Sequence, residues 1–102
     1  MPKGYLIAHV DVTDPEAYKG YVTANAEAFA KYEGRFLVRG GGNEILEGTS
    51  RSRHVVLEFP SYKAAWDCYH SPEYGKAMAI RKPASEGDVV IVEGYDGPQP
   101  GE

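Results

Sequence analysis

The chain is poor in cysteine, with Cys68 as the single one among its 102 residues. One cysteine excludes an intramolecular disulfide and any metal site built from several thiolates. The chain also lacks the run of about 18 apolar residues that a membrane-spanning helix needs, and it does not open on a basic segment followed by an apolar stretch. We therefore expect a cytoplasmic protein with no membrane partner.

Positive charge is scarce as well. Lys and Arg number 11 against 15 Asp and Glu, which gives a net charge of −4. A negatively charged body repels phosphate backbones, and no aromatic-rich strand of the kind found in RNA-binding sheets is present, so we expect no nucleic-acid partner. His9 and His54 stand outside any HxH or HExxH spacing, so we expect neither a metal nor another cofactor.

The remaining composition is that of an ordinary globular protein, with 42% hydrophobic and 25% charged residues. A chain of this length supports one hydrophobic core. We expect residues 1–95 to form a single domain. Residues 96–102 carry no core-forming side chain and are expected to form a flexible tail.

Hydrophobic periodicity alternates between the two-residue repeat of strands and the longer repeat of helices. We predict a strand at residues 4–12, a helix at about 15–33, a strand at 35–39 that resumes at 45–47, a strand at 53–59, a helix at 61–70, a further helical segment at 71–81 and a last strand at 89–93.

Turn and cap residues fix these boundaries. Asp14-Pro15-Glu16 and Ser71-Pro72-Glu73 each combine a capping side chain, a proline at the first helical position and an acidic first turn. Gly34 is typical of a helix stop in the left-handed conformation, and Lys82-Pro83 ends the last helical segment. The glycines at 40–42 are followed by a strand and not a helix, which indicates a kink or bulge with positive φ and not a phosphate-binding loop.

The order βαββαβ predicts a ferredoxin-like α+β fold. Two right-handed βαβ crossovers that share one hairpin form a four-stranded antiparallel sheet with the helices on one face. The first and third strands are then central.

Alternation along the two central strands separates the two faces of this sheet. The helix side is predicted to hold Leu6, Ala8, Val10, Val12, Val55, Leu57 and Phe59, and the other side Tyr5, Ile7, His9, Asp11, His54, Val56 and Glu58. The last strand is apolar on both sides, which indicates that both faces are covered. The helices cover one face only, so we predict a homodimer in which a second copy covers the other.

Titratable groups gather on the face that the helices leave bare. Either histidine there is a candidate general base, oriented by Glu58 or Asp11, while Arg39 reaches in from the hairpin to bind a substrate oxygen. The alternative is a set of interface salt bridges with no catalytic role. The catalytic candidates are His9, His54 and Glu58, and the substrate-binding candidates on this face are Tyr5, Asp11 and Arg39.

A second candidate site lies between the helices and the sheet. Tyr21, Trp66 and Tyr69 belong to an aromatic set on the predicted helices that either lines a pocket for a flat organic ligand or fills the core. Cys68, in the same helix, is interpreted as a packing or surface residue because no catalytic cysteine motif surrounds it.

Several motifs resemble domain-of-unknown-function family 1330, in the family's order from Gly4 to Gly94. They are Gly4-Tyr5, Asp11 to Tyr18, Gly34 to Gly41, Leu46-Glu47-Gly48, Glu58 to Ser61, Ala65, Tyr69, Ser71 to Tyr74, Arg81 and Val92-Glu93-Gly94. The resemblance implies a ferredoxin-like fold in the dimeric α+β barrel superfamily. That superfamily includes cofactor-free monooxygenases, lactone isomerases, haem-dependent peroxidases and ligand-sensing domains, so it does not select a reaction.

Two functions remain open from the sequence. The first is an enzyme that acts on a small organic metabolite in a pocket of a dimeric α+β barrel, by cofactor-free acid–base chemistry of a monooxygenase or isomerase kind. The second is a non-catalytic module that binds a small molecule or another protein. The absence of nucleophile, metal and phosphate motifs agrees with the second.

Overall fold

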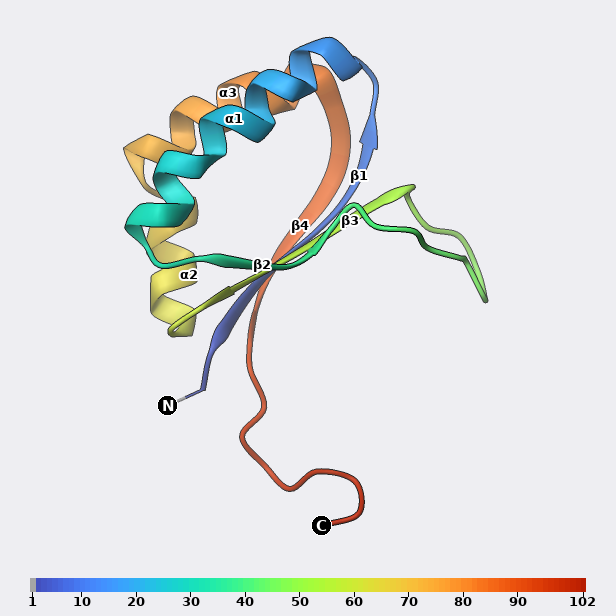
Figure 1. Ribbon diagram of the computed structural model, residues 1–102, viewed down its shortest axis with the longest axis vertical. Coiled ribbons are helices and arrows are strands. Elements are labelled where there is room, and N and C mark those ends of the chain that lie inside the picture. The colour runs from blue at the N-terminus through green and yellow to red at the C-terminus, as the bar shows by residue number, and fades with distance from the viewer. Residues whose placement is uncertain (1) are drawn as a thin grey trace.

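The α+β topology follows directly from the element boundaries of a computed structural model, which describes residues 2–102 (Figure 1). The elements are β1 (Gly4–Val12), α1 (Pro15–Lys31), β2 (Arg35–Arg39), β3 (Arg53–Phe59), α2 (Tyr62–Tyr69), α3 (Pro72–Ala84) and β4 (Ser85–Glu93). Neighbouring strands are antiparallel in the order β2-β3-β1-β4, and the helices lie on one side of the sheet. The predicted ferredoxin-like fold with β1 and β3 central is confirmed.

The predicted caps begin all three helices. The Asp14 carboxylate accepts from Ala17 N at 3.2 Å, and the Ser61 and Ser71 hydroxyls accept from Ala64 N at 3.0 Å and Tyr74 N at 3.1 Å. Each bond satisfies a backbone N–H that the first helical turn leaves without a partner. The helical segment that follows β3 is therefore divided into α2, which ends at Tyr69, and α3, which begins at Pro72, as the repeated cap predicts.

The end of α1 corrects one expectation. The left-handed residue is Glu33, with φ of 62°, and not Gly34. Gly34 closes the helix by donating its N–H to Phe29 O at 2.8 Å. A Cβ at Gly34 would lie 2.8 Å from the Phe59 ring, so glycine is needed there for close packing against β3.

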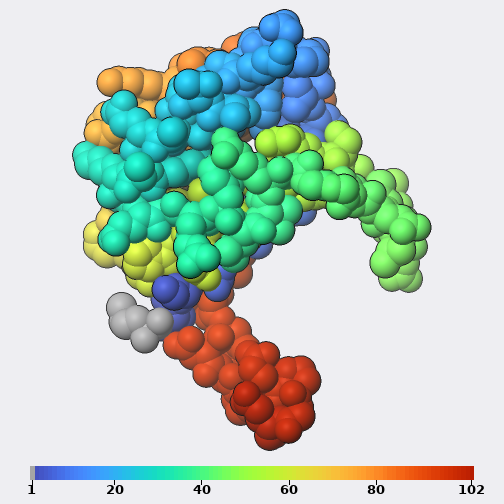
Figure 2. Space-filling model, viewed as in Figure 1, coloured from blue at the N-terminus to red at the C-terminus, as the bar shows by residue number. Residues whose placement is uncertain are grey.

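The segment 40–52 forms a projecting loop, so the predicted continuation of β2 at residues 45–47 is wrong (Figures 1 and 2). Gly40 has the expected positive φ, 66°. Beyond it, the Ile45 and Leu46 side chains are 51% and 84% exposed, because no neighbouring strand or helix covers them. Two apolar residues are too few to hold a strand without a buried face.

The last helix and strand are longer than predicted. Pro83 lies within the final turn of α3, where the loss of one backbone hydrogen bond does not end the helix before Ala84. β4 begins at Ser85 and not at Val89, because Glu86 to Asp88 pair with β1 although their side chains are polar. No helix within residues 2–102 is both long and apolar enough to cross a membrane.

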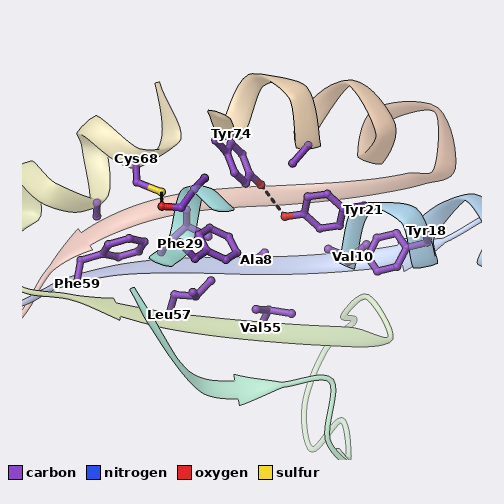
Figure 3. Close-up of a cluster of buried hydrophobic side chains, with 14 of the residues drawn as sticks. Ala8, Val10, Tyr18, Tyr21, Phe29, Val55, Leu57, Phe59, Cys68 and Tyr74 are labelled. Carbon is purple, nitrogen blue, oxygen red and sulfur yellow. Dashed lines mark hydrogen bonds between the residues drawn. The ribbon is translucent and has the colours of Figure 1, made fainter. Parts of the chain in front are cut away.

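The core lies between the sheet and the helices (Figure 3). The side chains predicted for the helix side of β1 and β3 are buried there, with Val12 partly so. On β4, Val89 and Ile91 pack on the core, whereas Val90 and Val92 are 49% and 42% exposed. Cys68 is fully buried, and burial raises the pKa of its thiol to about 12, so it is a packing residue.

Candidate functional site

The face of the sheet without helices, called the open face below, carries an apolar row that crosses every strand. The row contains one aliphatic side chain from each strand: Val90, Ile7, Val56 and Val38. Val90 and Val38 at its two ends are 49% and 42% exposed. An apolar row of this extent on a free sheet surface is typical of an interaction site.

Beside this row, two imidazoles meet. His9 and His54 are paired across β1 and β3, and their Nδ1 atoms lie 2.8 Å apart with the rings edge to face. One Nδ1 must carry the proton and the other must accept it, since a histidine ring nitrogen donates only when protonated. While this contact persists, at least one of the two rings is neutral. When both are neutral, the donating ring is held in a fixed position with an unprotonated Nε2 that can act as a base.

Arg51 connects the next two carboxylates on the open face. Its Nη1 donates to Asp11 Oδ2 at 2.9 Å, and its Nε donates to Asp88 Oδ2 at 3.1 Å. Asp11 also accepts from the backbone N–H of Ser52 at 3.0 Å, which, with Arg51, keeps the pKa of that carboxyl below its ordinary value. Sequence reasoning missed Arg51, because a polar loop residue next to Ser and Thr gives no periodic signal.

These side chains surround a hollow of about 510 Å³, lined by His9, Thr49, Ser50, Arg51 and Asp88. The residues that line it come from both central and edge strands and from the end of loop 40–52. Imidazole, guanidinium and hydroxyl groups therefore face one space that is large enough for a small organic molecule. Within residues 2–102, no three His, Cys, Asp or Glu side chains converge as metal ligands would.

The orienting role expected of the carboxylates is not what the structure shows. Glu58 accepts from the Tyr5 hydroxyl at 3.2 Å, with the Ile7–Val56 pair between it and the histidines. Asp11 is engaged by Arg51 and Ser52. Glu58 and Asp11 therefore bond to groups other than the histidines. The hydrogen bond between the two imidazoles is what orients their rings.

Arg39 lies on the opposite side of the sheet from the site predicted for it. An irregularity between Phe36 and Val38 shifts the register of β2, so Arg39 pairs with Val55 on the helix side. Its guanidinium carbon lies 4.0 Å from the centre of the Phe36 ring. Simple alternation fails here because the bulge adds one residue to the strand.

The aromatic candidates divide between two places. Tyr21 lies in the core, with its hydroxyl 2.7 Å from that of Tyr74. Trp66 is 48% exposed and stacks on His70 at 3.8 Å between ring centres. Trp66 and Tyr69 line a groove of about 330 Å³ beside β4, together with Val89, Val90 and Ile91. They do not share a pocket with Tyr21.

Asp11→Asn is expected to release the end of loop 40–52 from β1. The lowered pKa shows that the ionised carboxylate is the form that holds Ser52 and Arg51. This contribution is complete above the ordinary carboxyl pKa of about 3.9 and is lost as the pH falls through the lowered value. In the variant at neutral pH, hydrogen exchange of the Ser52 amide should become about tenfold faster.

Asp88→Asn is the matched control for that experiment. Asp88 also accepts from Arg51 but makes no bond to Ser52. Its substitution should leave exchange at Ser52 unchanged. Equal acceleration in both variants would show that Arg51, and not the Asp11 carboxylate, fixes the loop.

The four-stranded antiparallel sheet with all helices on one face defines a protein of the ferredoxin-like α+β class, here with an open face that is partly apolar. The chain belongs to the family described as Domain of unknown function (DUF1330), which matches residues 3–95. No curated protein matches it.

Solved structures agree on the fold. A protein of unknown function from Rhodopseudomonas palustris has 17% identity and a TM-score of 0.74, over 94% of this chain and 85% of that one. SnoaB, a cofactor-independent oxygenase from Streptomyces nogalater, has 12% identity and a TM-score of 0.62, over 100% of both chains. A dimeric ferredoxin-like protein of unknown function from Thermobifida fusca has 18% identity and a TM-score of 0.62, over 90% and 91%. These similarities establish the fold and not the activity.

Proposed function

We propose that the protein is a homodimer that binds a small organic metabolite at its open face and transforms it by cofactor-free acid–base chemistry. The observation that carries the proposal is the 2.8 Å contact between the Nδ1 atoms of His9 and His54. A fixed pair of imidazoles both accepts and returns a proton, which is what an isomerase or a cofactor-free oxygenase requires of its residues.

The dimer follows from the apolar row on the open face. Val90 and Val92 are 49% and 42% exposed, whereas Val89 and Ile91 on the same strand pack on the core. A second copy placed on this face by two-fold symmetry would remove both from water and turn the open hollow beside His9 into an enclosed site. The dimeric relative from Thermobifida fusca supports this arrangement.

Each open-face group then has a role. The imidazole that donates through Nδ1–H has its unprotonated nitrogen at Nε2, and this Nε2 withdraws a proton from an acidic C–H or O–H group of the metabolite. Arg51, already held by Asp11 and Asp88, shapes the wall of the site. The Tyr5 hydroxyl, bonded to Glu58, offers a polar contact on the far side of the apolar row. That SnoaB is a cofactor-independent oxygenase shows that this fold accommodates such chemistry.

One observation favours a binding module without turnover as the second candidate. Asp11, Asp88 and Glu58 are all engaged by Arg51 or Tyr5. These three carboxylates are then not available as a separate general acid, and the hydrogen bond of the two histidines is to each other.

The test compares three single substitutions that keep a polar side chain. A pool of small ketonic and phenolic acids is incubated with the protein, and conversion is followed by mass spectrometry. His9→Gln and His54→Gln should each lower turnover by about 10²–10⁴-fold. His70→Gln is the control, since His70 stacks on Trp66 far from the pair and should retain full turnover.

Full turnover in a variant that lacks both His9 and His54 would contradict catalysis by the pair. A compound retained in native mass spectra but never converted would favour the binding module. The pair itself is observable as a ¹⁵N–¹⁵N coupling through the Nδ1–H···Nδ1 bond. This coupling should be absent from His9→Gln and His54→Gln, because one of the two ring nitrogens is then missing.

A further inference from the structure

Three arginines on the helix side of the sheet have no acidic partner. Arg39, Arg53 and Arg81 line a cavity between α1, α3 and the sheet, and no Asp or Glu lines it with them. Among residues 2–102, none of the three takes part in an ion pair. Three guanidinium groups around one space, with no acidic side chain beside them, create a local positive potential. This local charge is opposite in sign to the net charge of the protein, which is −4.

Arg81 is the most constrained of the three. It is only 7% exposed, in the last turn of α3, and its Nε is buried without a hydrogen-bond partner. The Nε of Arg53 is likewise buried and unbonded. A buried guanidinium without an anion is unfavourable, because it has lost its hydration and gained no counter-charge. Arg81 is buried and Arg53 is half-buried, and the unbonded Nε of both at one cavity indicates an anionic ligand and not a structural ion pair.

Neutral donors reach the same cavity. Figure 3 shows the Tyr21 and Tyr74 hydroxyls pointing toward each other, 2.7 Å apart. One of them donates to the other, so the proton of the accepting hydroxyl is free to bond a ligand. Guanidinium and phenol donors with no carboxylate acceptor match the oxygens of an anion.

Apolar side chains set the class of that anion. Tyr18, Phe29, Phe36, Val55 and Leu57 form much of the remaining lining. Aromatic rings favour a flat apolar body, which inorganic phosphate or sulfate does not have. We propose that this cavity binds the carboxylate of a small organic acid with a planar apolar body.

The present cavity of about 20 Å³ has room for about one water molecule. The carboxylate would occupy that space next to Arg81 and Arg53, and the body would displace Phe36 and Arg39 outward. These two residues lie on β2, which is an edge strand bonded only to β3. Arg39 is exposed at the rim, so it can fold over a bound acid without breaking an existing ion pair.

This site is independent of the proposed function. It shares no residue with the hollow beside the histidines and lies on the other side of the sheet. Failure of either proposal therefore leaves the other standing.

The experiment titrates the protein with sodium benzoate at constant ionic strength and follows the arginine Nε–H signals in ¹⁵N–¹H spectra. The signals of Arg81 and Arg53 should shift with saturation, whereas benzamide, the uncharged analogue, should leave them in place. Arg53→Gln and Arg39→Gln should each weaken benzoate binding by about tenfold, the effect of a lost charge-assisted hydrogen bond.

Arg35→Gln is the matched control. Arg35 lies on the same strand as Arg39 but pairs with Glu58, on the open-face side, so its substitution should leave benzoate affinity unchanged. Three results would overturn the proposal: no shift of Arg81 and Arg53, equal shifts with benzamide, or equal loss of affinity in Arg35→Gln. Shifts confined to Arg51 would place benzoate on the open face and would overturn it as well.

Discussion

Val90→Glu is expected to convert the proposed dimer into a monomer that remains folded. The side chain belongs to the apolar row and is 49% exposed in the single chain, so the protomer itself has no need of valine there. In the proposed dimer, the two glutamates would be placed within the apolar row of the covered face, where each would lose its hydration. The dissociation constant of the dimer should rise about 100-fold or more.

Sedimentation equilibrium measures this change, and circular dichroism verifies that the fold persists. Leu46→Glu is the control, because Leu46 is 84% exposed on the projecting loop and outside the apolar row. It should leave the association unchanged. A wild-type protein that sediments as a monomer at high concentration would contradict the dimer, and so would a Val90→Glu variant that stays dimeric.

Phe59→Ala is expected to cause a large loss of stability, because Phe59 is one of the largest fully buried side chains in the core. Phe59 is 1% exposed at the end of β3, contacts the Phe29 ring edge to face and fills the space that Gly34 leaves open. Removing a buried ring costs about 3–5 kcal/mol, since the surrounding side chains collapse only in part. The free energy of unfolding of a small domain is about 5–15 kcal/mol, so this is a large share of it.

Urea denaturation measures the loss as a lower transition midpoint with an unchanged slope. Leu46→Ala is the control and should change the free energy of unfolding by less than about 0.5 kcal/mol, as exposed sites do. A loss below about 1 kcal/mol for Phe59→Ala would show that α1 and β3 are less tightly packed than described.

The fold was predictable because local signals and global topology agree in this chain. Asp14 and Ser71 mark helix starts through side-chain bonds that depend only on neighbouring residues. Strict alternation in β1 and β3 places one set of side chains under the helices. The boundary errors arose where polar residues such as Glu86 and Asp88 pair in a strand that has no buried face at that point.

The candidate site was predictable only in part. His9 and His54 were expected on one face of neighbouring strands. Their direct pairing depends on the register between β1 and β3, which cannot be read from the sequence. Arg39 was misplaced because a bulge is invisible to a pattern of period two. Arg51 and Arg81 could not be recognised from the sequence, because their roles depend on contacts in the folded chain. Arg51 forms an ion pair with Asp11, and the buried Nε of Arg81 has no hydrogen-bond partner.

Arg53 and His54 are consecutive on β3 yet belong to different faces of the sheet. Deleting one residue after either of them would move every following side chain of β3 to the opposite face of the sheet. Polar side chains would then replace aliphatic ones in the core. Length variation is therefore excluded from residues 53–59. Between residues 41 and 50 the chain makes no ladder bonds, so insertions and deletions among natural homologues should concentrate there.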